Sequence, residues 1–429
     1  MVLMQPDIAL AVARSLVRMT REGGVVPRWP LGHGYTHCTC SAKHCLSPVN
    51  MPPQAYEYCI WCAGMIGNHA TQIVLDTVRK GVPGEFDAEV LWDALNRTAT
   101  EATGWPLADL SDYERYGFCA ADQNVRAPAH ASAPHSGCDC GLCCVQEWAA
   151  SCTLAYAFDD WAMSELSDLL GKPQATVNYF AKRSLSYRKT FDPESRFFCP
   201  RFRNGTFSCP AEFAPELVQG GDKVGGYAEG DAWQWRWFVP GDVPGLIELL
   251  GGRTSFVKEL ETFFDKTPGF IGGIALVNPY YWAGNEPDIL APWLFSLAGR
   301  PDLTAKWTRW VLDRYYTTKP DGLPGNDDFG TLSAWAVWAW VGFYPLTGTD
   351  DYMLGSPRFP HIRIKPQGDG PVIDVRAHGA SSTAVYVSGC TWDGQNLTRP
   401  VLSHAALARG GALECWMTTA QAEAAWVEK

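Results

Sequence analysis

Residues Gly322–Pro345 read GLPGNDDFGTLSAWAVWAWVGFYP and combine a turn with a helix. The turn is formed by glycines and a proline, and Asn326, Asp327 and Asp328 follow it as residues that favour a helix start. From Thr331 onward the spacing is helical, and one face is apolar: Leu332, Trp335, Trp338 and Val341. The sequence therefore predicts two adjacent carboxylates where a loop enters a buried, Trp-rich helix.

These two carboxylates are subject to opposing electrostatic effects. The positive end of the helix stabilises their charged forms, while mutual repulsion disfavours the charge on one of them. The simpler interpretation is that Asp327 or Asp328 only caps the helix. Trp335 and Trp338 are expected to be core residues rather than ligand contacts.

Composition restricts the class of protein. With 429 residues, 46% hydrophobic and 19% charged, the chain is globular. The 19 Trp and 16 Tyr fit sugar-stacking clefts, although a core could absorb many of the rings. A net charge of -11 argues against nucleic acid and suits a neutral ligand or a divalent cation. No membrane span is expected and no oligomeric state is indicated.

The location of the protein is left open by the sequence. The N-terminal segment is an amphipathic helix without a signal-peptide core. Three glycosylation sequons, at Asn96, Asn204 and Asn396, would matter only in a secretory compartment. Secretion is expected if a longer chain carries a signal peptide.

Cysteine is unevenly distributed, since 11 of the 15 residues lie between Cys38 and Cys152. The clumps HCTCSAKHC, CIWC and CDCGLCC could bind zinc. Residues 39–63 and 124–144 instead look like insertions, because they lack periodicity and removing the first joins HGYTHC to the helix start GMIGNHA. We interpret both as irregular insertions, with unspliced introns as their origin and zinc modules as the alternative.

Helical periodicity covers most of the chain up to Gly355. GMIGNHATQIVLDTVRKG (residues 64–81) is expected to start a helix, with Asn68 or His69 near its first turn. Further helices are expected over residues 145–170, 173–190, 253–264, 287–297 and 302–316. Paired helices of this length predict an (α/α) toroid whose loops form a central funnel. After Gly355 the period becomes two, and HIRIKP, PVIDVRA, TAVYVSG and ALECWMT read as antiparallel strands. We expect a mainly α catalytic domain over residues 1–355 and a β-strand region over 356–429.

Three polar loops stand at helix starts: Tyr227–Trp235 (YAEGDAWQW), Gly284–Asp288 (GNEPD) and Gly325–Asp328 (GNDD). A glycosidase needs a carboxylic acid that protonates the leaving oxygen and a carboxylate that activates water or attacks carbon. The aromatic neighbours of Glu229 would raise its pKa and keep it protonated, as an acid requires. Asp327 or Asp328 would stay ionised, as a base requires.

Together the three loops resemble glycoside hydrolase family 92, the calcium-dependent exo-acting α-mannosidases. The resemblance extends to RWPLGHGYT, MIGNHA, LAYAFDDWA and GGALECWM. It implies an (α/α)6 toroid, inversion, Glu229 as general acid and the pair Asp327–Asp328 as the source of the base. It also implies a Ca²⁺ ion that grips two mannose hydroxyls, and oxygen donors of the kind Ca²⁺ prefers are present at Asn285, Glu286 and Asn326.

The expected substrate is a mannose-containing glycan. The residues expected to bind it are Trp29, Tyr35, Asp160, Trp233, Asn285 and Glu286. The alternative role for Asp160 is a structural hydrogen bond to a neighbouring loop. For His69, which lies near a helix start, the simpler interpretation is that it only satisfies backbone groups. Family members that cleave α-1,2 linkages tend to have the dipeptide His-Glu where this chain has Asn285 and Glu286. An α-1,2 linkage is expected, with α-1,3 and mannosyl-phosphate substrates left open.

The chain also departs from the family pattern, because it starts inside that pattern. The N-terminal β-sandwich of the family is therefore expected to be missing, and with it part of the sugar pocket. The alternative function is a truncated, weak or inactive remnant that at most binds mannosides.

Overall fold

A computed structural model describes residues 1–24, 26, 66–101, 110–122, 148–209, 226–268, 280–366 and 370–421. The two predicted insertions fall outside these residues, as do Trp29 and Tyr35. The chain forms two compact units. The central unit comprises Val12–Leu75 and Phe86–Gly241; the C-terminal unit comprises Met1–Ala11, Asp76–Glu85 and Asp242–Lys429. Helices α1 (Pro6–Gly23) and α3 (Ala70–Lys80) have residues in both.

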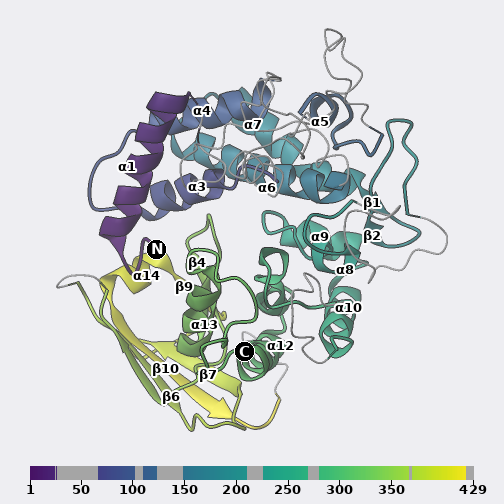
Figure 1. The fold of residues 1–429 in the computed structure, drawn as a ribbon. Helices are drawn as coiled ribbons and strands as arrows, with labels where there is room; N and C mark the ends of the chain where they lie inside the picture. The colour runs from purple at the N-terminus through teal and green to yellow at the C-terminus, as the bar shows by residue number, and fades with distance from the viewer. Residues whose placement is uncertain are drawn as a thin grey trace. The chain divides into compact units, whose positions relative to one another are not determined.

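The central unit is built around α6 (Ala149–Leu169), whose residues are buried on nearly every side (Figure 1). Small and apolar residues around the whole helix explain this burial. Contacting helix α6 are α4 (Ala88–Thr100), α7 (Gln174–Arg183) and the 3₁₀ helix η2 (Ser184–Lys189). The unit is completed by α5 (Leu110–Tyr116), α8 (Ala232–Trp235) and the pair β1 (Phe191–Asp192) and β2 (Phe197–Phe198).

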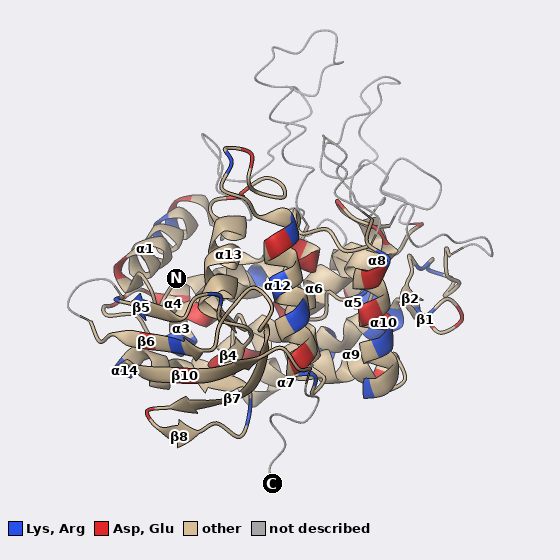
Figure 2. Cartoon of the chain, turned by 90° about the horizontal axis from the view of Figure 1, so that it is seen from below, with Lys and Arg blue, Asp and Glu red and all other residues tan. Residues whose placement is uncertain are grey.

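The helices of the C-terminal unit include α9 (Val243–Leu249), α10 (Arg253–Asp265), α12 (Pro301–Tyr315) and α13 (Thr331–Val341). Acidic and basic side chains are interspersed along α10 and α12 (Figure 2), and Lys306 of α12 lies 3.5 Å from Glu261 of α10. Such a mixed pattern is typical of solvated helix faces. Helix α13 begins at Thr331 as predicted, and Gly330 and Gly342 at its two ends have left-handed backbone. Trp335 is buried and Trp338 packs against the core, which confirms both as core residues.

The C-terminal unit also contains two sheets. The larger has the strand order β5-β6-β10-β7-β8, with bounds His361–Ile364, Ile373–His378, Gly411–Thr418, Tyr386–Trp392 and Gln395–Asn396. The four predicted strands are confirmed, but β10 runs parallel to β6 with Leu413 opposite Val375. The sequence did not indicate the smaller sheet, which consists of β3 (Phe343–Pro345), β4 (Asp351–Leu354) and β9 (Val401–Ser403), nor the helix α14 (His404–Arg409).

One predicted helix is wrong. Residues 287–297 form three short elements instead: η3 (Glu286–Asp288), η4 (Ala291–Trp293) and α11 (Leu294–Leu297). Pro287 and Pro292 each lie within the first two positions of a short helix, as proline prefers, because its ring excludes it from a helix interior. The apolar spacing alone did not reveal these breaks.

Two disulfides were missed at the sequence level. Cys199 bonds Cys209 in the central unit, and Cys390 of β7 bonds Cys415 of β10, its direct partner in the antiparallel register. All four cysteines lie outside the cysteine-rich segments HCTCSAKHC, CIWC and CDCGLCC. Disulfides are typical of proteins that fold in an oxidising compartment.

Candidate active site

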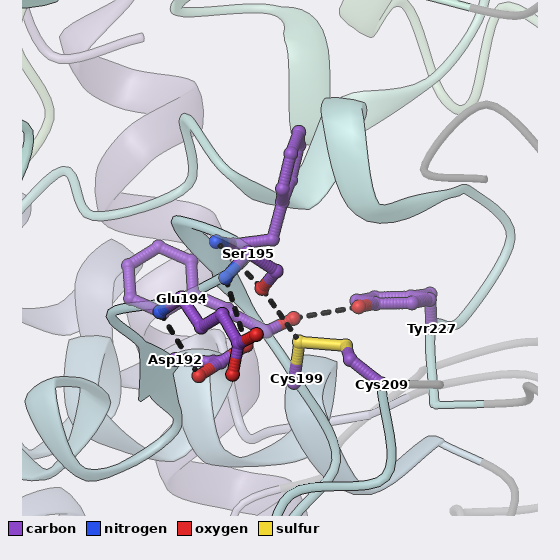
Figure 3. Close-up of a disulfide and its surroundings, with 8 residues drawn as sticks. Asp192, Glu194, Ser195, Cys199, Cys209 and Tyr227 are labelled. Atoms are coloured by element: carbon purple, nitrogen blue, oxygen red, sulfur yellow. Dashed lines mark hydrogen bonds between the residues drawn. A yellow bond between two sulfur atoms is a disulfide. The ribbon is translucent and has the colours of Figure 1, made fainter. Parts of the chain in front are cut away.

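The residues before Glu229 are fixed to the end of β2 (Figure 3). The hydroxyl of Tyr227 donates a hydrogen bond to the carbonyl oxygen of Phe198 at 2.6 Å. Burial, and to a lesser extent the charge of Asp231, raises the pKa of Tyr227, so its hydroxyl stays a donor. Cys199 follows Phe198 directly and is bonded to Cys209. The disulfide therefore restrains the segment on which the Glu229 loop rests.

Glu229 itself has a left-handed backbone, with φ of 46°. The residue before it is held on both sides: the N–H of Ala228 donates to Ser151 Oγ at 2.9 Å, and its carbonyl accepts from Trp235 Nε1 at 2.7 Å. A left-handed non-glycine residue costs ~1–3 kcal/mol and persists where surrounding contacts impose it, often at functional sites. The half-buried carboxylate is thus presented by a strained, well-anchored turn.

Helix α8 starts immediately after this turn. Asp231 and Gln234 form a capping box, with hydrogen bonds of 2.9 and 3.0 Å between each side chain and the backbone N–H of the other residue. Trp233 is buried with its ring edge-on to Phe197, at 5.0 Å between ring centroids. The aromatic surroundings expected for the Glu229 side chain stay a prediction. The predicted sugar contact of Trp233 stays a prediction.

In the C-terminal unit, the GNEPD and GNDD loops touch through two glycines. A Cβ atom on Gly325 would lie 2.6 Å from the carbonyl oxygen of Gly284, and one on Gly284 would lie 2.7 Å from that of Pro324. Since real Cβ atoms do not approach so closely, both positions require glycine. The backbones of the two loops therefore lie in close contact just before Asn285 and Asn326.

The GNEPD loop is also anchored to α13. Asp288 is buried and its Oδ2 accepts the backbone N–H of Trp282 at 2.8 Å. The indole N–H of Trp335 donates to the carbonyl of Ile289 at 2.9 Å. Asp288 and Trp335 thus shape the loop, and Asn285 and Glu286 are held at its tip.

The two adjacent aspartates have different environments. Oδ1 of Asp327 accepts the backbone N–H and the hydroxyl of Ser333, both at 2.9 Å, which confirms helix capping for Asp327. Asp328, Phe329 and Gly330 are three consecutive left-handed residues, with φ of 44°, 57° and 91°. Asp328 is exposed, and partial burial together with the charge of Asp327 raises its pKa. The predicted effect of repulsion on one aspartate is confirmed for Asp328.

The predicted metal ligands offer a mainly neutral donor set. Asn285 is 7% exposed, while Glu286 and Asn326 are exposed. Among the residues that the structure describes, no group of three or more His, Cys, Asp or Glu side chains could hold a metal ion. Amide and backbone carbonyl oxygens are not in that group, yet they are ligands that calcium accepts. The hard oxygen donors around the Gly284–Gly325 contact therefore fit Ca²⁺.

Asp160 is 1% exposed, which favours the structural role given as its alternative. Its carboxylate accepts the hydroxyl of Tyr113 at 2.7 Å and the Nε–H of Arg183 at 3.0 Å. Burial raises the pKa of Asp160 to about 7, although Arg183 and Tyr113 act in the opposite direction. These hydrogen bonds do not test whether Asp160 also contacts the substrate, so that contact stays a prediction.

The residues from 55 to 419 match the glycosyl hydrolase family 92 catalytic domain. The chain belongs to this family. It is similar to an uncharacterized secreted glycosidase of Arthroderma benhamiae, with 27% identity over 387 residues, covering 84% of this chain and 46% of the relative.

Solved structures of the family are also similar. A family GH92 α-mannosidase of Bacteroides thetaiotaomicron in complex with mannoimidazole is 27% identical with a TM-score of 0.79, covering 99% of this chain and 50% of that one. An inverting mannosidase of the same organism is 24% identical with a TM-score of 0.74, covering 98% and 51%. The chain thus spans about half the length of these relatives. The likeness confirms the predicted fold class, a mainly α (α/α)6 toroid with small antiparallel sheets.

None of the helices within the described parts of the chain is both long and apolar enough to cross a membrane.

Proposed function

We propose that this protein hydrolyses terminal α-linked mannose from glycans. The observation that carries the proposal is the backbone conformation of two acidic residues in a chain of family 92. Glu229 and Asp328 are both non-glycine residues with left-handed backbone, at φ of 46° and 44°. Strained backbone of this kind persists only where surrounding contacts impose it, and it clusters at active sites. The α-mannosidases among the similar structures support mannose as the sugar.

In the proposed mechanism, Glu229 is the general acid. Its proton goes to the glycosidic oxygen as the bond from that oxygen to the anomeric carbon breaks. Glu229 is half-buried, and Trp233, four residues further on, packs edge-on against Phe197. The strained turn fixes the direction of the carboxyl group, which proton transfer requires.

Asp328 is the proposed general base, and Asp327 its positioning residue. Asp327 accepts both hydrogen bonds of Ser333, whereas Asp328 is exposed and its raised pKa makes it a stronger base than an ordinary aspartate. Asp328 takes a proton from the water that attacks the anomeric carbon on the face opposite to the leaving group. The product then has the inverted configuration.

Asn285, Glu286 and Asn326 would hold Ca²⁺, together with backbone carbonyls near Gly284 and Gly325. When bound, the ion supplies positive charge that orients sugar hydroxyls. The close backbone contact of Gly284 and Gly325 supports a shared site, because the proposed ligands follow these two glycines in the sequence. We propose that the protein cleaves α-1,2-linked mannose. The same assay tests α-1,3-linked mannose and mannosyl-phosphate as alternative substrates.

We also propose that the protein works in the secretory pathway or outside the cell. The disulfides Cys199–Cys209 and Cys390–Cys415 favour an oxidising compartment. A similar protein of Arthroderma benhamiae is described as secreted. The catalytic domain is proposed to span residues 1–355, with the β-strand region over 356–429.

The test is mannose release from α-1,2-mannobiose and mannose-rich glycans by purified protein. We expect release that is lost in Glu229→Gln, with the variant folded like the parent. Mannoside binding with no release would favour the alternative of an inactive remnant. Undiminished release by Glu229→Gln would exclude Glu229 as the acid.

A further inference from the structure

A small cavity lies inside the central unit, next to the start of α3. Its walls include residues of α4 and α6, and the buried ones are partly apolar and partly polar: Asn68, Leu95, Thr98, Asp159, Asp160 and Met163. The space available to the centre of a water-sized sphere is ≈ 10 Å³. A cavity needs roughly 10–15 Å³ of such space to hold one water molecule. The cavity thus has the size of a site for a single water.

Two neutral side chains at this cavity lack hydrogen bonds to other protein groups. Asn68 is 3% exposed, and within the described parts of the chain neither its Nδ2 nor its Oδ1 has a partner. Thr98 is 7% exposed, and its Oγ1 likewise has no partner among the described residues. Buried polar groups are costly without a partner, and most of them bind protein groups or ordered water. The amide and the hydroxyl therefore point to a ligand that forms hydrogen bonds.

The charged groups at the cavity already have partners. Asp159 Oδ2 accepts the backbone N–H of Asn68 at 2.7 Å. Asp160 pairs with Arg183, at 2.9 Å between Oδ1 and Nη2. A metal ion at the cavity would leave the N–H groups of the Asn68 amide without an acceptor, because a metal ion cannot accept a hydrogen bond. A water molecule both donates and accepts, so it can bind this amide and the hydroxyl of Thr98 together.

We propose that the cavity binds one ordered water molecule, which forms hydrogen bonds with the side chains of Asn68 and Thr98. The water links the start of α3 to α4. Asp159 of α6 holds the backbone of Asn68, and the water holds its side chain. The two contacts together fix the start of α3 against both neighbouring helices. This site goes beyond the proposed mannosidase function, because no step of the reaction depends on it.

The first test is the melting temperature of Thr98→Val, which keeps the shape of the side chain and removes its hydroxyl. If the water binds Thr98, the variant loses a hydrogen bond, and its melting temperature should fall by roughly 2–4 °C. In a dry cavity, removing an unpaired hydroxyl would leave the melting temperature unchanged or raise it.

The matched control is Thr20→Val on α1. Thr20 is 4% exposed, and its Oγ1 also has no partner among the described residues, but Thr20 does not line this cavity. Thr20→Val should therefore melt at or above the temperature of the parent. A Thr98→Val variant that behaves like Thr20→Val would overturn the inference.

The second test is a high-resolution crystal structure of the parent protein. We expect one water peak in the cavity, about 2.7–3.2 Å from polar atoms of the Asn68 and Thr98 side chains. An empty cavity would overturn the inference, as would a metal ion with oxygen contacts of about 2.3–2.6 Å. If Thr98→Val does not fold, this structure decides alone. Neither test uses mannose release, so failure of the proposed function leaves both of them valid.

Discussion

Asp327 accepts two hydrogen bonds from Ser333, one from its backbone N–H and one from its hydroxyl, each at 2.9 Å. This pair fixes Asp327 at the start of α13 and leaves the next residue, Asp328, on a left-handed turn. Two identical neighbours in the sequence thereby acquire different roles. One stabilises the helix, and the other has the exposure and the raised pKa of a base.

The first prediction separates these roles. Asp328→Asn should lower kcat by roughly 10²–10⁴, the range for loss of general base catalysis, with an unchanged melting temperature. Asp327→Asn should cost about 1 kcal/mol of folding stability through the lost cap and should retain more activity. Steady-state kinetics and denaturant unfolding measure both. An inactive Asp327→Asn beside an active Asp328→Asn would reverse the assignment.

The second prediction concerns pH. Burial and the neighbouring charge raise the pKa of Asp328, and only the ionised form acts as a base. The acidic limb of kcat/KM should therefore have its midpoint above 3.8, the ordinary value for aspartate. Replacing Asp327 by Asn removes a negative neighbour, so the limb should move to lower pH. A limb that stays in place in this variant would show that another group controls it.

The third prediction tests the acid through the leaving group. Glu229→Gln should lose nearly all activity on α-1,2-mannobiose, whose leaving oxygen needs a proton. It should retain much more activity on α-mannosyl fluoride, whose leaving group departs without protonation. Equal losses on both substrates would indicate a positioning role instead.

The fourth prediction follows from Figure 3, where the Cys199–Cys209 disulfide adjoins the Phe198 carbonyl that receives Tyr227. Replacing both cysteines by serine should destabilise the protein by ~2–4 kcal/mol. It should also lower kcat, because the Glu229 turn loses its support. The matched control is the same replacement at Cys390 and Cys415, which should reduce the melting temperature while kcat is retained. Equal kcat values in the two double variants would show that the Cys199–Cys209 disulfide does not support the Glu229 turn.

The fifth prediction concerns calcium. A chelator should abolish mannose release and added Ca²⁺ should restore it, with a melting temperature that rises with Ca²⁺ concentration. Gly325→Ala should weaken Ca²⁺ binding in calorimetry, because its Cβ would separate the two loops. Gly389→Ala is the control, since a Cβ there meets no atom within 4 Å and the backbone is not left-handed. Full activity in chelator would exclude the ion from the reaction.

Turn signals and apolar residues explain what could be predicted from the sequence. Helix α13 is confirmed because glycines mark both of its ends and the residues between them are mostly apolar. Strand β10 is confirmed because its buried residues, Leu413 and Cys415, alternate along the strand. The helix predicted over residues 287–297 is wrong because two prolines interrupt a spacing that still looks helical.

Other features depend on partners distant in the sequence. The capping role of Asp327 depends on the left-handed turn that follows it, and the burial of Asp160 depends on Arg183 and Tyr113. The disulfides join cysteines that no spacing rule pairs. The contact between His69 and Asp159 joins the separate motifs MIGNHA and LAYAFDDWA, and no spacing in the sequence indicated it.

The most direct test of the proposed mechanism is the distance between the carboxyl groups of Glu229 and Asp328 in a crystal structure with a mannose-shaped inhibitor. We expect about 6.5–9.5 Å, with the sugar between the two groups and room for one water on the Asp328 side. A separation far outside this range, or packed side chains filling the space between the two carboxyl groups, would contradict it.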